Sequence, residues 1–535
     1  MFSITMEGSI VCGFISVFPV AVTVTVVAIL VHLYFYGAWR RTAEVRRKLR
    51  AQGVTGPPPS ILYGNLPEMQ KIQLQTAAMA SPPHRASAIV AHDYTSTLFP
   101  YFVEWRKQYG PLYTYSTGTR QHLYANKVEL VKDLSLSNNL NLGKPFYVTK
   151  KLAPILGHSI VRSNGAIWAV QRKIIAPEFF MDRVRAMAVL MADAASSLVE
   201  KWESRIGDGA SVEIEVDEDL RGFSADVISR ACFGSSYEKG KEIFSKLRDL
   251  QKLISEGSFL FGYSSLSDRF LQPRKHKRIK KLEKEIESLI WETVQQRQKE
   301  FSKTSSSEKD LLQLIMEATT NDPNVGANDS SKNFIVDNCK SIYFAGHEST
   351  AVAATWTLML LALHPEWQDC IRSEFAHACP DGRPDTTVIS NLKTVSMVVH
   401  EALRLYPPAA FVARETFADT RLGNVVVPKG VCLWTLIPTL HREVEIWGED
   451  ANEFKPERFK NGIAKACKFP QAYVPFGAGP RLCLGKNFAL VQLKIIISLI
   501  VSKFRFSLSP EYCHCPSYRM IVEPANGVKI AFQRL

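Results

Sequence analysis

The sequence predicts a mainly α-helical protein with a minor β part, placed behind an N-terminal transmembrane helix. Residues 8–39 contain no charged side chain. Helical apolar patterns dominate from Asn164 onward, and strand-like runs are confined to a few short regions. Composition is ordinary for a globular protein, with 46% apolar and 22% charged residues. We therefore expect one anchor followed by one large globular domain.

The uncharged run from Gly8 to Trp39 is long enough to cross a bilayer once as a helix. Basic residues cluster directly after it, and only Glu7 precedes it, so the positive-inside rule places the rest of the chain in the cytosol. A cleaved signal peptide is the alternative, but no basic segment precedes the run, which is also too long for a signal's apolar core. We expect an anchor over 1–39, a basic and proline-rich linker over 40–60, and a single domain over 61–535.

Apolar periodicity and turn residues place the remaining elements. Alternating aromatic and Thr residues around a Gly predict a hairpin over Tyr113–Tyr124, and strand-like runs return over Arg421–Leu436. Two long helices are expected, an amphipathic one over Phe270–Phe301 and a mostly apolar one over Phe334–His364 that crosses the core. Two stretches rich in polar or small residues are expected to lack regular structure. Residues from about 75 to 96 are expected to be a loop or a poorly ordered insertion, and the two polar clusters of 302–332, on either side of a short helical segment, are expected to be surface loops.

The formal net charge of +13 is compatible with a nucleic acid, an anionic membrane or an acidic protein partner. Several of the charges follow the apolar N-terminus, which favours a membrane, and no arginine-rich or aromatic-interleaved tract favours nucleic acid. Ten cysteines without paired spacing favour a reducing compartment over a disulfide framework. Cys513-His514-Cys515 suggests zinc only weakly, because no second ligand pair accompanies it.

The strongest local signal is the glycine-rich stretch FGAGPRLCLG at positions 476–485. Its glycines allow the backbone to pass close to a ligand. Phe476 can shield a sulfur from solvent, and Arg481 offers a cation to an acidic cofactor group. A helical pattern begins at Asn487, which places Cys483 near a helix N-terminus, where the thiolate is favoured. These features fit ligation of a haem iron by one cysteine, and the alternative is an inert thiol in a tight turn.

This stretch resembles the haem-binding signature of the cytochrome P-450 superfamily, whose fixed Phe, Gly, Arg, Cys and Gly positions are all matched. The resemblance implies a helical haem domain with a small β-rich region. It further implies that Cys483 is the axial ligand of the iron of haem b, and that Phe476, Arg481 and Gly485 contact the cofactor. Members of this superfamily use O₂ and electrons from NADPH, which reach them through the flavins of a partner reductase.

Two further stretches resemble the family's cofactor-holding segments. Trp168 and Arg172 have the Trp-x-x-x-Arg spacing of the family's helix C, and one turn of helix places both on one face. The resemblance implies that they hydrogen-bond a haem propionate, because a guanidinium suits a carboxylate well. Arg414 lies ten residues after Arg404, where related enzymes often place another propionate-binding Arg. The alternative for each is an ordinary surface or ion-pairing arginine.

Another pair of motifs resembles the frame beneath the haem. Glu401 and Arg404 match the Glu-x-x-Arg of helix K, and Arg458 lies in a stretch similar to Pro-Glu-Arg-Phe. The resemblance implies a buried triad of these three residues that locks the fold and takes no part in catalysis. An exposed ion pair worth little is the alternative for the Glu-x-x-Arg spacing alone.

The stretch Ala345–Thr350 resembles the oxygen-binding segment of helix I, in which an acid precedes an alcohol. The resemblance implies that Glu348 and Ser349 are catalytic residues that relay protons. Ser349 stands where Thr is usual, and it lacks the methyl group that restricts the Thr rotamer. The alternative is a buried helix whose Ser bonds the carbonyl four residues back.

Finer resemblance points to plant gibberellin and ent-kaurenoid oxidases, on residues 334–344 and 224–230. It implies hydroxylation or epoxidation of a tetracyclic diterpenoid, in a pocket lined by Pro408–Val412 and by the segment between Phe146 and Ser163. It also implies a monomer in the endoplasmic reticulum membrane, spanning once, with the catalytic domain in the cytosol. Another plant steroid, terpenoid or cytokinin is the alternative substrate. A haem-thiolate isomerase or dehydratase is the alternative enzyme, although such relatives tend to lose the acid–alcohol pair.

Overall fold

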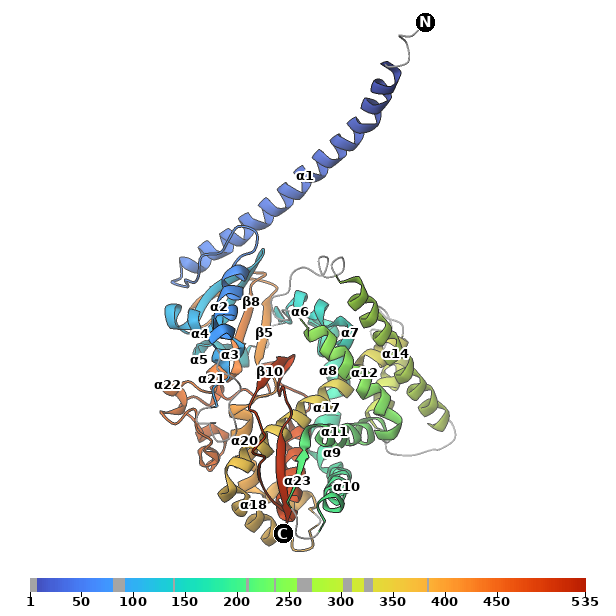
Figure 1. The fold of residues 1–535 in the computed structure, drawn as a ribbon, viewed down its shortest axis with the longest axis vertical. Coiled ribbons are helices and arrows are strands. Elements are labelled where there is room, and N and C mark those ends of the chain that lie inside the picture. Colours follow the sequence, from blue (N-terminus) through green and yellow to red (C-terminus); the bar gives the residue numbers. More distant parts are fainter. Residues whose placement is uncertain are drawn as a thin grey trace.

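The computed structural model (Figure 1) describes residues 7–79, 92–137, 140–207, 211–234, 237–256, 272–301, 310–321, 331–382 and 384–535. A long N-terminal helix projects from a body that is rich in helices, and the largest sheet lies beside the base of that helix. The mainly helical fold with a minor β part confirms the sequence prediction.

The helices follow the chain order. The N-terminal third contains α1 (Glu7–Arg50), α2 (Leu66–Met79), α3 (Thr95–Leu98), α4 (Pro100–Tyr109), α5 (Val128–Leu136), α6 (Phe146–Lys151), α7 (Ala153–Leu156), α8 (Gly165–Ile175) and η2 (Ala176–Phe179). The middle contains α9 (Met181–Ala186), α10 (Ala188–Ile206), α11 (Val216–Phe233), α12 (Tyr237–Ser255), α14 (Pro273–Phe301), α15 (Leu311–Asn321) and α17 (Ser331–Leu363). The last third contains α18 (Pro365–Ala378), α19 (Thr386–Asn391), α20 (Lys393–Leu405), α21 (Ile437–Leu440), α22 (Val444–Trp447), η3 (Pro456–Phe459), η4 (Ile463–Lys465), η5 (Pro470–Ala472), η6 (Gly479–Arg481) and α23 (Lys486–Lys503).

The strands form one five-stranded sheet and three smaller ones. The large sheet has the order β1-β2-β8-β5-β3, in which only β2 and β8 run parallel. The smaller sheets are β4-β12-β9, β6-β7 and β10-β11, and all of their pairs are antiparallel. The strands are β1 (Leu112–Thr117), β2 (Arg120–Ala125), β3 (Leu142–Gly143), β4 (Val212–Glu215), β5 (Phe411–Thr416), β6 (Thr420–Leu422), β7 (Val425–Val427), β8 (Cys432–Leu436), β9 (Phe504–Leu508), β10 (Pro516–Arg519), β11 (Ile521–Pro524) and β12 (Lys529–Arg534).

Helix α17 crosses the helical body and packs against α11, α14, α20 and α23. A helix that is apolar all round belongs in a core. Accordingly, nearly every α17 side chain between Phe334 and Ala362 is buried. The exceptions in that span are Ala345, Gly346 and Ser349. These three residues share one part of the helix, and the site described below lies there.

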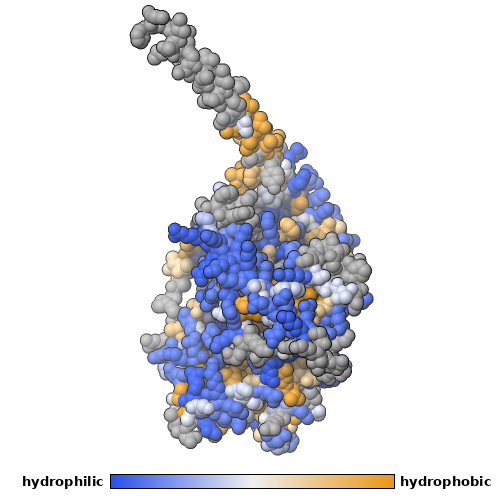
Figure 2. Space-filling view, turned by 90° about the vertical axis from the view of Figure 1, so that its right-hand side faces the viewer, coloured by the Kyte–Doolittle hydropathy of each residue, from blue (hydrophilic) through white to orange (hydrophobic). Residues whose placement is uncertain are grey.

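Helix α1 fits a membrane anchor by length and composition, and a signal sequence would have the same properties. Its apolar side chains from Val22 to Tyr36 are exposed where they are described, and Figure 2 shows apolar residues gathered where the helix leaves the body. Its C-terminal turns belong to the body, since Leu49 is fully buried against the β-rich region and Thr42 donates a hydrogen bond to the Thr119 carbonyl at 2.7 Å.

Several predicted elements are confirmed and one differs. The hairpin forms from β1 and β2, the core-crossing helix is α17, and the amphipathic helix is described from Pro273. The loop expected over 75–96 is wrong at both ends, because the Ala- and Gln-rich end of α2 stays helical and α3 begins at Thr95; residues 80–91 lie outside the described part. Residues 40–50 of the expected linker continue helix α1, which ends at Arg50, since their Arg, Lys and Ala residues favour helix.

The short helical segment expected within 302–332 is α15, and the two polar clusters beside it lie outside the described residues.

Candidate active site

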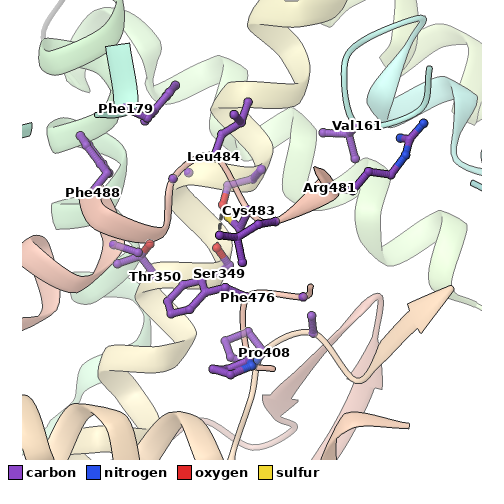
Figure 3. Close-up of a pocket in the computed structure, with 18 of the residues that line it drawn as sticks. Val161, Phe179, Ser349, Thr350, Pro408, Phe476, Arg481, Cys483, Leu484 and Phe488 are labelled. Carbon is purple, nitrogen blue, oxygen red and sulfur yellow. Dashed lines mark hydrogen bonds between the residues drawn. The ribbon is translucent and has the colours of Figure 1, made fainter. Parts of the chain in front are cut away.

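A cavity of about 400 Å³ lies where helix α17 faces the loop before helix α23 (Figure 3). Its wall is mostly apolar, and it includes residues from both segments expected to line a substrate pocket, Pro408–Val412 and 146–163. Of the predicted site residues, it brings together Trp168, Arg172, Ser349, Arg414, Phe476, Arg481, Cys483 and Gly485. Glu348 is not part of the wall.

The loop that carries Cys483 is fixed by its own backbone. The Cys483 N–H donates to the Phe476 carbonyl at 3.0 Å, and the Leu482 N–H donates to the Gly479 carbonyl at 2.9 Å. Gly479 has a φ of +71°, and a Cβ there would lie 2.7 Å from the Leu134 carbonyl oxygen. Only glycine fits such a position without strain. The loop therefore presents the Cys483 sulfur to the cavity in a defined place.

The Cys483 side chain is open to the cavity and otherwise enclosed by protein. Burial raises the pKa of its thiol, while the Gly485 N–H and the cations of Arg172 and Lys144 act in the opposite direction. Desolvation thus outweighs these effects, in contrast to the thiolate expected near a helix N-terminus. A bound metal cation would reverse this balance, because a coordinating thiol is deprotonated.

The guanidinium groups of Arg172, Arg414 and Arg481 also face the cavity, and each makes hydrogen bonds only to neutral groups among the described residues. No described carboxylate pairs with any of them, and no described Asp or Glu lines the wall. Burial lowers the pKa of Arg414 and of Arg481 to about 10. A buried cation without a counter-ion is costly, so these three groups fit a ligand that carries carboxylates.

Trp168 lies between two of these cations. The Arg481 guanidinium carbon is 4.5 Å from the centre of the Trp168 ring, and that of Arg172 is 5.7 Å away. Such cation–π contacts hold both groups in place. One thiol, a flat apolar wall and fixed cations are the donor set that a haem with its two propionates requires, so the residues present fit that cofactor.

Helix α17 forms the wall opposite Cys483 with its small residues. Gly346 leaves no room for a side chain, because a Cβ there would lie 2.6 Å from the Ile228 side chain. The Ser349 hydroxyl lines the cavity and donates to the Ala345 carbonyl at 2.7 Å. This hydrogen bond to the carbonyl four residues back is the structural alternative expected for Ser349. The same side chain nevertheless faces the cavity. Thr350 lines the same wall and is buried.

Glu348 points elsewhere, as expected for a residue about 100° around the helix from Ser349. Its carboxylate pairs with Arg221 at 3.1 Å and with Arg248, and both arginines also pair with Glu523. Burial would raise the pKa of Glu348, but His347 and the two guanidiniums outweigh burial and lower it. The structure therefore holds an ionised Glu348 in a buried network of two acids and two arginines.

The buried triad expected beneath the site is confirmed. Arg404 donates two hydrogen bonds to Glu401, at 2.7 and 2.8 Å, and Arg458 lies 3.4 Å from the same carboxylate. Arg404 and Glu401 are fully buried. The remaining Arg404 donors reach the carbonyls of residues 441, 451 and 453. One helix turn is thereby tied to the irregular segment that leads to the Cys483 loop.

Sequence reasoning missed Lys144, which also lines the cavity. It lies just after β3, and a single Lys beside a Gly and a Pro has no motif that could have marked it. The zinc alternative has no support, since no group of three or more metal-binding side chains occurs among the described residues. His514 instead hydrogen-bonds the hydroxyls of Tyr512 and Tyr406.

The comparisons with known proteins agree with this site. The family model "Cytochrome P450" matches residues 87–532. The chain is 54% identical over 498 residues to cytochrome P450 714A2 of Arabidopsis thaliana, covering 92% of this chain and 93% of the relative. It is 47% identical over 513 residues to cytochrome P450 714C2 of Oryza sativa subsp. japonica, covering 95% and 97%. The chain therefore belongs to the cytochrome P450 family of monooxygenases, for which a haem with a thiolate ligand is implied.

Proposed function

We propose that the protein inserts one oxygen atom from O₂ into a tetracyclic diterpenoid, a gibberellin or an ent-kaurane acid, by hydroxylation or epoxidation. A cavity with a mostly apolar wall and a few cations suits a rigid hydrocarbon skeleton that bears a carboxylate. A plant steroid, another terpenoid or a cytokinin is the second candidate for the same wall. The observation that carries the proposal is the Cys483 thiol facing this cavity beside cations that have no counter-ion among the described residues.

Within that proposal, Cys483 is the axial ligand of the iron of haem b. Trp168, Arg172, Arg414 and Arg481 hold the propionates, while Phe476 and Gly485 pack beside the ligating sulfur. Bound in this way, the haem supplies the oxygen-activating chemistry of the family. The protein itself supplies a positioned sulfur, fixed counter-charges and a wall that keeps bulk water from the substrate.

Proton delivery is proposed to pass through the Ser349 hydroxyl. Its proton is held on the Ala345 carbonyl at 2.7 Å, and rotation about one bond turns it into the cavity. Glu348 is the proposed acid of the pair. Its carboxylate must leave Arg221 and Arg248 before it can receive and pass a proton, so its part in the relay requires a change in the buried network.

The proposed setting is the endoplasmic reticulum membrane. Helix α1 is the single span there, the basic residues after it keep the catalytic domain on the cytosolic side, and the protein acts as a monomer. Electrons come from NADPH through the flavins of cytochrome P-450 reductase, an acidic partner that the net charge of +13 would attract.

The isomerase or dehydratase alternative keeps the haem and drops O₂. The presence of the acid–alcohol pair Glu348-Ser349 favours the monooxygenase. Product formation that depends on reductase and NADPH separates the two classes, because an isomerase needs neither.

A substrate screen tests the proposal directly. Full-length protein and a reductase, expressed together in a host, are supplied with ent-kaurenoic acid and several gibberellins, and products are identified by mass spectrometry. We expect one added oxygen in at least one of these compounds. Absence of turnover with all of them, from protein that binds haem, would remove the diterpenoid proposal and leave the enzyme class intact.

A further inference from the structure

Lys144 is a fourth cation in the cavity wall, beyond the three arginines that the motifs account for. It lies between β3 and α6, on the chain segment that enters the cavity from the large sheet. Lys144 and Arg481 lie on the same side of the cavity, because both bond to one residue, Asn164.

The Lys144 backbone is fixed at this place. Its N–H donates to the Asn164 side-chain oxygen at 2.8 Å, and its carbonyl accepts from the Asn164 amide at 3.1 Å. The same Asn164 oxygen accepts from Arg481 at 2.8 Å. The preceding residue, Gly143, has little space for a side chain, since a Cβ there would lie 2.3 Å from the Phe417 ring and 2.6 Å from the Asn164 side chain, which would have to shift. This is a built position rather than a surface lysine that happens to turn inward.

The Lys144 ammonium has no described acidic partner. No described carboxylate lies within ion-pair distance, and no described Asp or Glu lines the cavity. Burial, together with the charges of Arg414 and Arg481, lowers the pKa of Lys144 to about 7. An anion beside this ammonium would stabilise its charged form, because a nearby opposite charge favours the ionised state.

The charges of the proposed cofactor do not balance the wall. Ferric iron, the porphyrin dianion and one thiolate sum to zero, so a haem brings the two negative charges of its propionates. Four cations line the cavity, namely Lys144, Arg172, Arg414 and Arg481. Two positive charges therefore remain when both propionates are bound, which favours a carboxylate beside Lys144, either that of a further anion or a propionate that Lys144 shares with an arginine.

We propose that Lys144 binds a carboxylate inside the cavity. Two sources have this chemistry, a propionate of the haem and the carboxylate of a substrate acid. The substrate source rests on the proposed function, whereas the propionate source rests only on haem binding.

The test compares Lys144→Met, which keeps the length and removes the charge, with Lys144→Arg, which keeps the charge. Lys150→Met is the matched control, because Lys150 is an exposed lysine on the adjoining helix α6. The first arm measures the rate at which haem passes from full-length protein to apomyoglobin. The second arm measures the Soret shift on titration with ent-kaurenoic acid and with its methyl ester.

A propionate partner predicts that Lys144→Met loses haem about tenfold faster, the effect of one modest ion pair. A substrate partner predicts that Lys144→Met binds the acid about tenfold more weakly and the methyl ester unchanged. In either case Lys144→Arg should behave nearly as the wild type does, and Lys150→Met should change neither haem loss nor acid binding. Wild-type haem loss and wild-type acid binding in Lys144→Met would overturn the proposal. If wild-type protein binds no diterpenoid, the substrate proposal fails alone, and the haem arm still decides the role of Lys144.

Discussion

Two buried sets of charges in this protein differ in one respect. In the triad of Glu401, Arg404 and Arg458, every donor of the central arginine is used, and a carboxylate stands against two guanidiniums. In the cavity, cations of equal chemistry contact only neutral groups of the described residues. A buried charge without a counter-ion is costly, and the triad avoids this cost because Glu401 lies beside its arginines. The triad, which we call the complete set, belongs to the structural frame beneath the site. The cavity cations, which we call the incomplete set, mark the place of a ligand.

The largest expected effect comes from breaking the complete set. Glu401→Gln leaves the fully buried Arg404 without an anion, while Arg458 keeps its ion pair with Asp450 at 2.6 Å, and removal of one partner of a buried pair costs about 3–5 kcal/mol. We expect very low yields of folded protein, or a large drop in the thermal midpoint measured by circular dichroism. Glu511→Gln, which removes an exposed partner of Lys529, is the control and should leave the midpoint unchanged. A stable Glu401→Gln protein would show that the triad is not part of the frame.

A second effect comes from acid, through the histidine that joins the frame to the Cys483 loop. His441 contacts the Arg404 carbonyl through Nδ1 and accepts the Val474 N–H through Nε2, both at 3.0 Å. Burial lowers its pKa to about 3, whereas the unfolded side chain titrates near its usual value of 6.5. Below pH 6.5 His441 therefore binds a proton in the unfolded state but not in the folded state. The stability of the folded state falls as the pH is lowered towards 3.

For this one group the loss between pH 7 and pH 5 is about 2 kcal/mol. Urea unfolding at the two pH values measures it. His441→Gln, which keeps a donor and an acceptor, should have a smaller difference between the two pH values by that amount. The same difference in wild type and variant would contradict the assignment to His441.

A third and smaller effect separates the incomplete set from the frame. Arg172→Met removes one cavity cation and the hydrogen bond at 3.1 Å to the Leu482 carbonyl. We expect the apoprotein to fold and the dissociation constant for haemin to rise about tenfold, as for loss of roughly 1.4 kcal/mol. The exposed neighbour offers the control Lys173→Met, for which haemin binding should not change. Unchanged haemin binding in Arg172→Met would mean that this cation serves the loop alone.

The smallest effect on stability is expected at Ser349. Ser349→Ala loses a hydrogen bond within its own helix, and the free energy of unfolding should change by less than about 0.5 kcal/mol. If the hydroxyl delivers protons, a smaller share of the electrons from NADPH leads to product in the variant, and more hydrogen peroxide forms. Measuring NADPH consumed, product and peroxide together tests this. Ser502→Ala removes a comparable bond on α23 and should leave coupling intact. Full coupling in Ser349→Ala would assign proton delivery to another group.

The sequence alone predicted the local structure wherever backbone geometry or burial allows few alternatives. The glycines around Cys483 and the apolar run of α17 were predictable, because backbone geometry and burial leave little choice there, whereas the Glu401 triad was predicted only from the resemblance to the family. The surroundings of Glu348 could not be predicted from its place beside Ser349 in the chain, since its partners Arg221 and Arg248 come from two distant helices. Lys144 was missed for the same reason, because only the folded chain brings it beside Arg481.

The central claim is that Cys483 binds a haem iron in this cavity. Full-length protein, reduced and exposed to carbon monoxide, should give the red-shifted Soret band of a thiolate-ligated haem. Cys483→Ser should lose that band, while Cys467→Ser and Cys513→Ser should keep it. A haem-loaded, folded wild-type protein without the band, or a Cys483→Ser protein that retains it, would contradict the account.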